Sequence, residues 1–365
     1  MQRLVPLALV LTTNFVGAQP PQPRLSPETA AGVDAAVVGE MDRQAFVGAA
    51  LGVIRDGEIA YLKGYGLADR EKSIPVTPET VFNWASNSKP LAAVAAAQLV
   101  ERNVLNLDSD VRRYVPEFPV TSGVVTTRHL LTHQSGLPHY ANGKVVPTVR
   151  AYGTRDPFRD PLRALDRFNE SPLMFRPGEK TSYSTYAYIL LSAVVQRAGD
   201  APFDDQVRRR IAGPLGMESL QLDVETRGQP DWAAAYVKDR SGRVGPAPDE
   251  ANYWKHGGGG YKSSVTDFAR WAAGLINRKL VSEQTETLMW TPVPLAGGES
   301  TTWGLGFTVE VRGGLKVSHN GRQPETSTRM VLYPRQRHGL VFMTNCGFGD
   351  VGAVTTAVYK ALDGK

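Results

Sequence analysis

Apolar residues recur at helical spacing near the start of the chain, after a Pro-rich stretch at residues 20–23. Between Val33 and Met41 they fall on one face of a helix. Ser26 and Pro27 precede this pattern, and this pair is typical of a helix start, because serine caps free amide groups and proline fits the first turn. The first element is therefore predicted to be a helix.

Two apolar, β-rich runs follow at residues 47–53 and 59–65. Asp56 and Gly57 lie between them, and an Asp-Gly pair tolerates the positive φ angles of a tight hairpin turn. These runs are predicted to be two antiparallel strands.

The far end of the chain has the same character, and the middle differs from both ends. From about residue 90 to 290 the apolar pattern is mostly helical. Short strands broken by Gly and Pro, and then a closing helix, are predicted at residues 307–311, 315–318, 328–333, 340–344 and 351–362. We therefore expect an α+β fold, in which both chain ends form one antiparallel sheet with flanking helices. The expected domains are a discontinuous sheet domain, 19–89 with 291–365, and an inserted, mainly helical domain, 90–290.

Composition narrows the classes of function. The chain has 365 residues, 42% of them hydrophobic, which is enough for a sizeable core. Lys and Arg number 41 against 36 Asp and Glu, and the excess is scattered, so we expect no nucleic-acid partner. Cys346 is the single cysteine, so no intrachain disulfide can form. The sequence leaves the oligomeric state open.

The first 18 residues predict export. Arg3 precedes an apolar stretch at residues 4–11, and Val16-Gly17-Ala18 is a small-residue cleavage pattern. We expect a signal peptide at 1–18, cleaved after Ala18, and a periplasmic or secreted protein. A stable membrane span needs roughly 20 apolar residues, which the sequence lacks.

Ser86 and Lys89 stand where a strand-like run gives way to an Ala-rich helix. A serine at a helix start lies near the positive end of the helix dipole, and a lysine one turn on shares its face. Such a lysine can take the proton that makes a serine hydroxyl a poor nucleophile. The alternative is a helix cap followed by a surface lysine, and the pair by itself does not decide between them.

Motifs in order along the chain give this pair a context. The sequence is similar to the class C β-lactamase and DD-peptidase family of active-site serine hydrolases, and within it resembles the branch of the mitochondrial serine β-lactamase-like protein. The segments that carry the resemblance are 86–89 (Ser-Asn-Ser-Lys), 129–137, 177–179, 183–185 (Tyr-Ser-Thr), 214–217, 257–260, 289–294, 303–306 and 319–321 (His-Asn-Gly).

The resemblance implies a role for each matching residue. Ser86 would be the acylated nucleophile, Lys89 its proton-handling neighbour and Tyr183 the completion of the base. Whether Lys89 or Tyr183 takes the proton stays open. His319 would stabilise charge or relay a proton, as a side chain that titrates near neutral pH. Gly321 would let backbone and substrate approach closely.

Three departures from the family pattern bear on the substrate. Thr185 replaces the usual asparagine, and its hydroxyl cannot offer a substrate amide a paired donor and acceptor. His319 replaces the lysine usual in class C β-lactamases, which favours peptide substrates. Arg322 is bulkier than the small residues often found there, so it narrows the cleft or binds a substrate carboxylate. Its N–H would be the second oxyanion donor, beside that of Ser86.

The expected activity is hydrolysis of peptides or amides, as in a DD-peptidase or carboxypeptidase. The alternatives are an esterase or β-lactamase that uses the same site, or a non-catalytic binding or assembly protein of the same fold. We expect no metal and no cofactor: His129 and His133 have a helical ligand spacing, but residue 130 is Leu where a zinc protease needs Glu. Packing or hydrogen bonding is the expected role of both histidines.

Overall fold

The computed structural model describes residues 25–119, 123–140, 142–152, 157–223, 231–248 and 251–363. The signal peptide predicted at residues 1–18 lies outside these ranges and stays a prediction.

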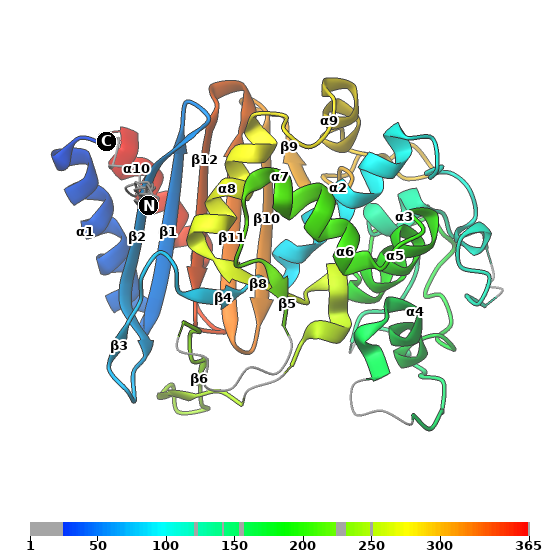
Figure 1. Cartoon of the computed structure of the whole chain (residues 1–365), viewed down its shortest axis with the longest axis horizontal. Coiled ribbons are helices and arrows are strands. Elements are labelled where there is room, and N and C mark those ends of the chain that lie inside the picture. Colours follow the sequence, from blue (N-terminus) through cyan, green and yellow to red (C-terminus); the bar gives the residue numbers. More distant parts are fainter. Residues whose placement is uncertain are drawn as a thin grey trace, which may run out of the picture.

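A seven-stranded antiparallel sheet forms the centre of the fold, with the strand order β3-β2-β1-β12-β11-β10-β9. Strand β1 from the beginning of the chain pairs with β12 from its end, in register from Ala49 opposite Thr344 to Ile54 opposite Gly339. The predicted α+β class, with one sheet built from both chain ends, is therefore confirmed (Figure 1). The strands are β1 Gly48–Arg55, β2 Glu58–Asp69, β3 Ile74–Pro75, β9 Thr308–Glu310, β10 Lys316–Gln323, β11 Thr326–Tyr333 and β12 His338–Thr344.

The β1–β2 hairpin turns where the sequence predicts it. Asp56 and Gly57 have φ angles of 55° and 79°, as a tight turn between right-twisted strands requires. Strand β10 is longer than predicted, because it continues through residues 319–323 up to the hairpin tip at Pro324 and Glu325.

Helices cover both faces of the sheet. Helices α1 (Pro27–Gln44) and α10 (Val351–Asp363) pack together on one face, and α8 (Val265–Ile276) packs on β1 and β12 from the other (Figure 1). Ser26 caps α1 as predicted, since its hydroxyl accepts a hydrogen bond of 3.1 Å from Thr29 N. Helix α8 lies on the sheet although its residues fall within 90–290, and the predicted division at 90 and 290 stays a prediction.

Most of the other helices lie beside the β10–β9 edge of the large sheet (Figure 1). Helix α2 (Ser88–Glu101) packs against α5 (Thr185–Ala198), and both are largely buried. A small sheet with the order β4-β8-β5 contacts the large sheet, because the carbonyl oxygen of Asn83 in β4 accepts a 3.0 Å hydrogen bond from Thr326 Oγ1 in β11. The remaining elements are β4 Val81–Asn83, β5 Gln221–Leu222, β6 Tyr236–Lys238, β7 Val244–Pro246, β8 Tyr261–Ser264, α3 Thr127–Leu131, α4 Pro161–Ala164, α6 Phe203–Val207, α7 Gly213–Leu215, α9 Glu283–Met289 and the short helical turns η1 Ala85–Asn87, η2 Val111–Arg113, η3 Pro157–Arg159, η4 Leu165–Arg167, η5 Arg208–Ala212, η6 Tyr253–Gly258 and η7 Pro334–Gln336.

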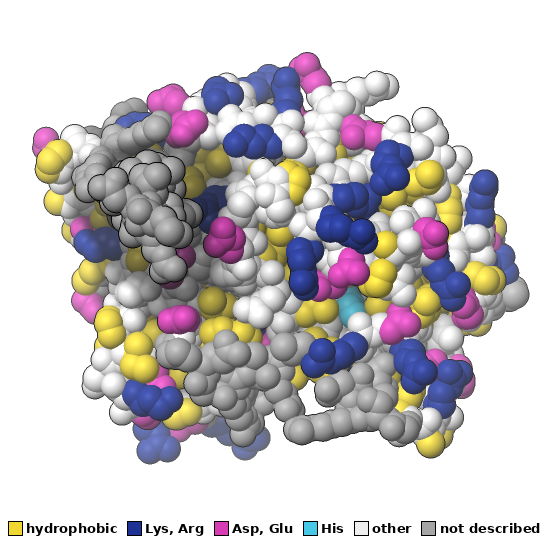
Figure 2. Space-filling model, in the orientation of Figure 1, with side chains coloured by type: hydrophobic (Ala, Val, Ile, Leu, Met, Phe, Trp, Pro, Cys, Tyr) yellow, Lys and Arg dark blue, Asp and Glu magenta, His cyan; other side chains and the backbone are white. Residues whose placement is uncertain are grey.

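Charges are mixed on the surface. Figure 2 shows basic and acidic side chains of the described residues interspersed over the face seen in Figure 1. Within the described part of the chain, no helix has the length and apolar character needed to cross a bilayer.

Candidate active site

Ser86 lies at the junction between β4 and α2. The short turn η1 follows β4 and runs directly into α2, so the Ser86 hydroxyl sits at the amino-terminal end of a buried 14-residue helix. Ser86 lines a cavity of about 570 Å³ between β10, α5 and η6, together with Tyr183, Thr185, His319 and other residues. The predicted serine is thus at a helix start and open to a ligand-sized space.

Lys89 is completely buried one turn along α2. Its Nζ lies 3.2 Å from Ser86 Oγ, 3.2 Å from Thr185 Oγ1 and 2.5 Å from the carbonyl oxygen of Gly258. Burial lowers the pKa of the Lys89 amine well below its usual range, and the positive charge of Lys255 acts in the same direction. The alternative of a surface lysine beside a helix cap is therefore excluded.

Tyr183 and Thr185 flank the capping residue of α5. The Ser184 hydroxyl accepts a hydrogen bond of 3.1 Å from Ala187 N, which starts the helix and fixes its two neighbours at the cavity. Burial raises the pKa of the Tyr183 phenol, although its hydrogen bond with Ser86 opposes this shift. Tyr183 therefore remains a neutral phenol near neutral pH. Thr185, through its hydroxyl, is bound to Lys89.

His319 lies on β10 beside the cavity and is almost fully buried. Its Nδ1 is 2.7 Å from the carbonyl oxygen of Asn320. Because that oxygen can only accept, Nδ1 carries the proton and Nε2 is left as an acceptor. Burial lowers the pKa of His319 to about 3, and the neighbouring Lys89 amine, when it is protonated, acts in the same direction. His319 is therefore neutral at physiological pH, in contrast to the predicted titrating histidine.

Gly321 and Arg322 follow on the same strand and also line the cavity. A Cβ on Gly321 would lie 2.4 Å from the carbonyl oxygen of Trp84 and 2.3 Å from Thr328 Oγ1. The close approach that demands glycine is therefore between β10 and the turn before Ser86, whereas the sequence predicted one between backbone and substrate. The guanidinium group of Arg322 donates a hydrogen bond to Gly349 O, at the rim of the cavity.

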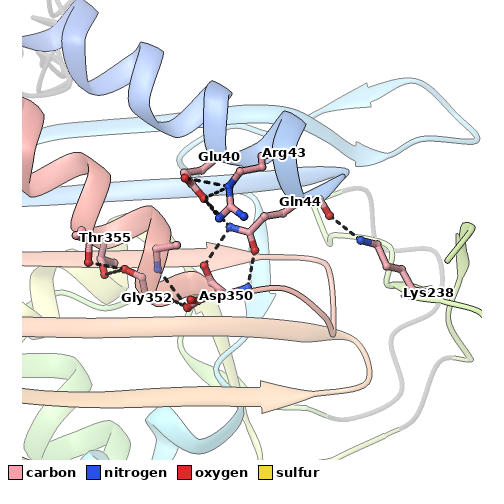
Figure 3. Close-up of polar contacts among 9 residues, drawn as sticks. Glu40, Arg43, Gln44, Lys238, Asp350, Gly352 and Thr355 are labelled. Carbon is pink, nitrogen blue, oxygen red and sulfur yellow. Dashed lines mark hydrogen bonds and ion pairs between the residues drawn. The ribbon is translucent and has the colours of Figure 1, made fainter.

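Hydrogen bonds from the last residue of α1 fix the cavity wall beside Arg322. Gln44 donates to the carbonyl oxygen of Asp350 at 3.1 Å and accepts from Asp350 N at 2.5 Å (Figure 3). Asp350 in turn caps α10 through a 2.8 Å bond from Gly352 N. Because Asp350, Val351 and Gly352 line the cavity, the α1–α10 pair fixes one of its sides.

Several cavity residues were not predicted from the sequence. His139, Tyr140 and Lys255 line the cavity, and Lys255 Nζ is hydrogen-bonded to Asn252 Oδ1. Burial lowers the pKa of His139 to about 4 and raises that of Tyr140 to about 12. Lys255 stands next to the glycine run 257–260, which was the one available signal that this segment borders the cleft.

His133 and His129 have the packing and hydrogen-bonding roles that the sequence predicts. The ring of His133 lies 4.3 Å from that of Tyr183, and its Nδ1 accepts a 3.2 Å bond from Ser184 N. His129 closes a capping box with Thr126 at the start of α3. Across the described residues, no three His, Cys, Asp or Glu side chains are grouped so that they could hold a metal ion.

A serine hydroxyl at a helix start, next to a buried amine and a neutral phenol in an open cavity, is the arrangement of an acyl-transferring serine hydrolase on an α+β scaffold. Comparisons with known proteins agree. The sequence model of the family described as Beta-lactamase matches residues 33–365, and the chain belongs to this family.

Relatives in the family are named for different activities. The human mitochondrial serine beta-lactamase-like protein LACTB is 27% identical, over 87% of this chain and 76% of its own length. Esterase EstB of Burkholderia gladioli is 34% identical, over 66% of this chain and 68% of its own. These matches confirm the predicted family and branch.

Solved structures confirm the fold. An octameric penicillin-binding protein homologue from Pyrococcus abyssi superposes with a TM-score of 0.77 at 26% identity, covering 92% of this chain and 78% of its own. A D-amino acid amidase from Ochrobactrum anthropi does so with a TM-score of 0.76 at 20% identity, covering 92% and 99%. This chain is therefore a serine hydrolase of the β-lactamase fold.

Proposed function

We propose that the protein hydrolyses peptides or amides through an acyl-enzyme formed on Ser86. The observation that carries this proposal is the 3.2 Å separation of Lys89 Nζ and Ser86 Oγ at the edge of an open cavity. A serine nucleophile needs a base within hydrogen-bonding distance, and Lys89 meets that condition before any substrate is bound.

Lys89 is the proton acceptor in this proposal. Its lowered pKa favours the neutral amine, which has two N–H groups and one lone pair. If the N–H groups bond to Gly258 O and Thr185 Oγ1, the lone pair is left facing the Ser86 hydroxyl. The raised pKa of Tyr183 disfavours a phenolate as the base. The sequence left the choice between Lys89 and Tyr183 open, and these pKa shifts support Lys89 as the base.

The reaction then proceeds in two half-reactions. Ser86 Oγ attacks the substrate carbonyl carbon while its proton moves to Lys89, and the proton passes on to the leaving amine, with the Tyr183 phenol in position to relay it. Water attacks the acyl-enzyme in the second half, gives its proton to Lys89, and Ser86 regains a proton as the acid product leaves. No cofactor is needed for this balance.

The oxyanion of each tetrahedral intermediate would be bound by the backbone N–H groups of Ser86 and Arg322. Strand β10 pairs with β9 only at residues 316–318, so no paired strand covers residues 319–323 on the cavity side in the described part of the chain. His319, as a neutral side chain with an acceptor at Nε2, would accept a hydrogen bond from the substrate or a water rather than stabilise negative charge.

Ester hydrolysis is a second candidate. The Thr185 hydroxyl is hydrogen-bonded to Lys89, so it does not take the place of the asparagine side-chain amide that the family pattern has for binding a substrate amide. The two candidates separate when one acyl group is offered as both ester and amide: the p-nitrophenyl ester and the p-nitroanilide of the same N-acetylated D-amino acid. We expect turnover of both, lost by several powers of ten in Ser86→Ala. Turnover of the ester alone would assign an esterase, and an unchanged Ser86→Ala rate would refute the proposed nucleophile.

Export to the periplasm or outside the cell is part of the proposal, and residues 3–18 support it through their charged start, apolar stretch and small-residue end. The test is amino-terminal sequencing of the protein recovered from a bacterial host. A start at Gln19 in the periplasmic or secreted fraction is expected, and retention of residues 1–18 in the cytoplasmic fraction would refute export.

A further inference from the structure

The residue before Ser86 has a backbone conformation that needs support. Ala85 has a φ angle of +47° and is completely buried. Residues with a side chain rarely adopt positive φ, and such strain persists only where surrounding contacts enforce it. A series of side-chain hydrogen bonds provides this support. In its first bond, Ala85 N donates to Asn83 Oδ1 at 2.8 Å.

Asn83 is itself fixed by a buried ion pair. Its Nδ2 donates to Asp223 Oδ2 at 2.7 Å, and Asp223 Oδ1 lies 2.6 Å from Lys262 Nζ. The Asp223 and Lys262 side chains are 2% and 13% exposed. Asn83 and Lys262 are also opposite each other in the β4–β8 ladder. The amide of Asn83 therefore has one orientation that satisfies both neighbours, and that orientation points its oxygen at Ala85.

The same carboxylate is also linked to a second segment that borders the cavity. Asp223 Oδ2 accepts a 3.1 Å hydrogen bond from Asn252 N, and Asn252 Oδ1 accepts one from Lys255 Nζ. Lys255 lines the cavity. Asp223 thus connects the turn that carries Ser86 with the segment that carries a cavity cation, although Asn83, Asp223 and Asn252 lie on three separate stretches of the sequence.

We propose that Asn83 and Asp223 are positioning residues for Ser86: they hold Ala85 at positive φ and so place the Ser86 hydroxyl against Lys89. The proposal rests on the proposed function of Ser86 and adds a requirement to it. Neither residue touches the substrate, so their removal lowers the rate of acylation and leaves substrate binding nearly unchanged. A displacement of about 1 Å between reacting groups costs on the order of 100-fold in rate.

The test measures kcat, KM, melting temperature and the rate of labelling by a fluorophosphonate in Asn83→Ala, Asn83→Asp and Asp223→Asn. We expect kcat and the labelling rate to fall together by about 100-fold in Asn83→Ala, with KM within about threefold. Asn83→Asp keeps the acceptor for Ala85 N but sets two carboxylates against each other. Its kcat, relative to wild type, should recover as the pH is lowered and the new carboxyl is protonated, because a protonated carboxyl can again donate to Asp223.

Asp267→Asn is the matched control. Asp267 is an equally buried carboxylate, 2% exposed, that accepts from Ser219 N at 2.7 Å and pairs with Arg270. Its hydrogen bonds tie α8 to the segment before β5 and do not involve η1, so this variant should lose melting temperature and keep its kcat.

The outcomes distinguish a failure of the positioning role of Asn83 and Asp223 from a failure of the proposed function of Ser86. A wild-type kcat in Asn83→Ala or Asp223→Asn overturns the positioning role, and so does an equal loss of kcat in Asp267→Asn. If Asn83→Ala does not fold, the isosteric Asp223→Asn decides alone. Absence of labelling in the wild type, or labelling that survives in Ser86→Ala, overturns the function of Ser86 itself and is visible before any Asn83 variant is made.

Discussion

Replacement of Gly321 by alanine tests how closely β10 must approach the turn that carries Ser86. The new Cβ would lie 2.4 Å from Trp84 O, where an ordinary contact is 3.4 Å or more, so the strand and the turn must separate by about 1 Å. The Thr328 hydroxyl, 2.3 Å from the same position, cannot simply rotate away without loss of its 2.9 Å bond to Trp84 O. A shift of about 1 Å predicts a loss of roughly 100-fold in kcat/KM, and overpacking costs about 1–3 kcal/mol of stability.

The assay is kcat/KM on a p-nitrophenyl ester, with the melting temperature recorded on the same preparation. Gly39→Ala is the control, because nothing lies within 4 Å of a Cβ at this position in α1. It should gain about 1 kcal/mol in unfolding free energy and keep full activity. A folded Gly321→Ala variant whose kcat/KM is within threefold of wild type would refute the argument that this contact places Ser86.

Three further predictions follow from the cavity side chains. Lys89→Met should lose about 10⁴-fold in kcat. Because burial lowers the pKa of the Lys89 amine in the folded state below that in the unfolded state, the advantage of Lys89→Met in unfolding free energy should grow as the pH is lowered from about 10; urea melts at several pH values check the sign. His319→Asn should lower kcat/KM by about tenfold without changing its dependence on pH between about 5 and 8, because the pKa of His319 is about 3; a lost pH dependence there would contradict this. Arg322→Ala frees Gly349 O and should lower KM for bulky acyl groups more than for acetyl esters; a KM that rises only for anionic substrates would instead assign Arg322 to carboxylate binding.

The sequence was a good guide to the sheet, because both ends of the chain carry local signals for it. The Asp56-Gly57 turn and the Ser26 cap are decided by residues within a few positions, and both were found. The extent of β10 was missed, since His319, Asn320 and Gly321 are poor strand formers that tertiary pairing with β11 overrides.

The site residues could be predicted where a sequence motif contains them. Six of the seven candidate residues line the cavity, and the seventh, Lys89, is buried beneath Ser86. The protonation of His319 and Tyr183 was not predictable, because it depends on burial by residues distant in sequence. The same applies to Asp223, whose partners Asn83 and Asn252 are 140 and 29 residues away.

The most direct measurement is the intact mass of the protein after incubation with a p-nitrophenyl ester, followed by mapping of the adduct to a peptide. The account predicts a transient increase by one acyl group, carried by the peptide that contains Ser86 and absent from Ser86→Ala. An adduct on any other residue, or hydrolysis at the wild-type rate by Ser86→Ala, would contradict it.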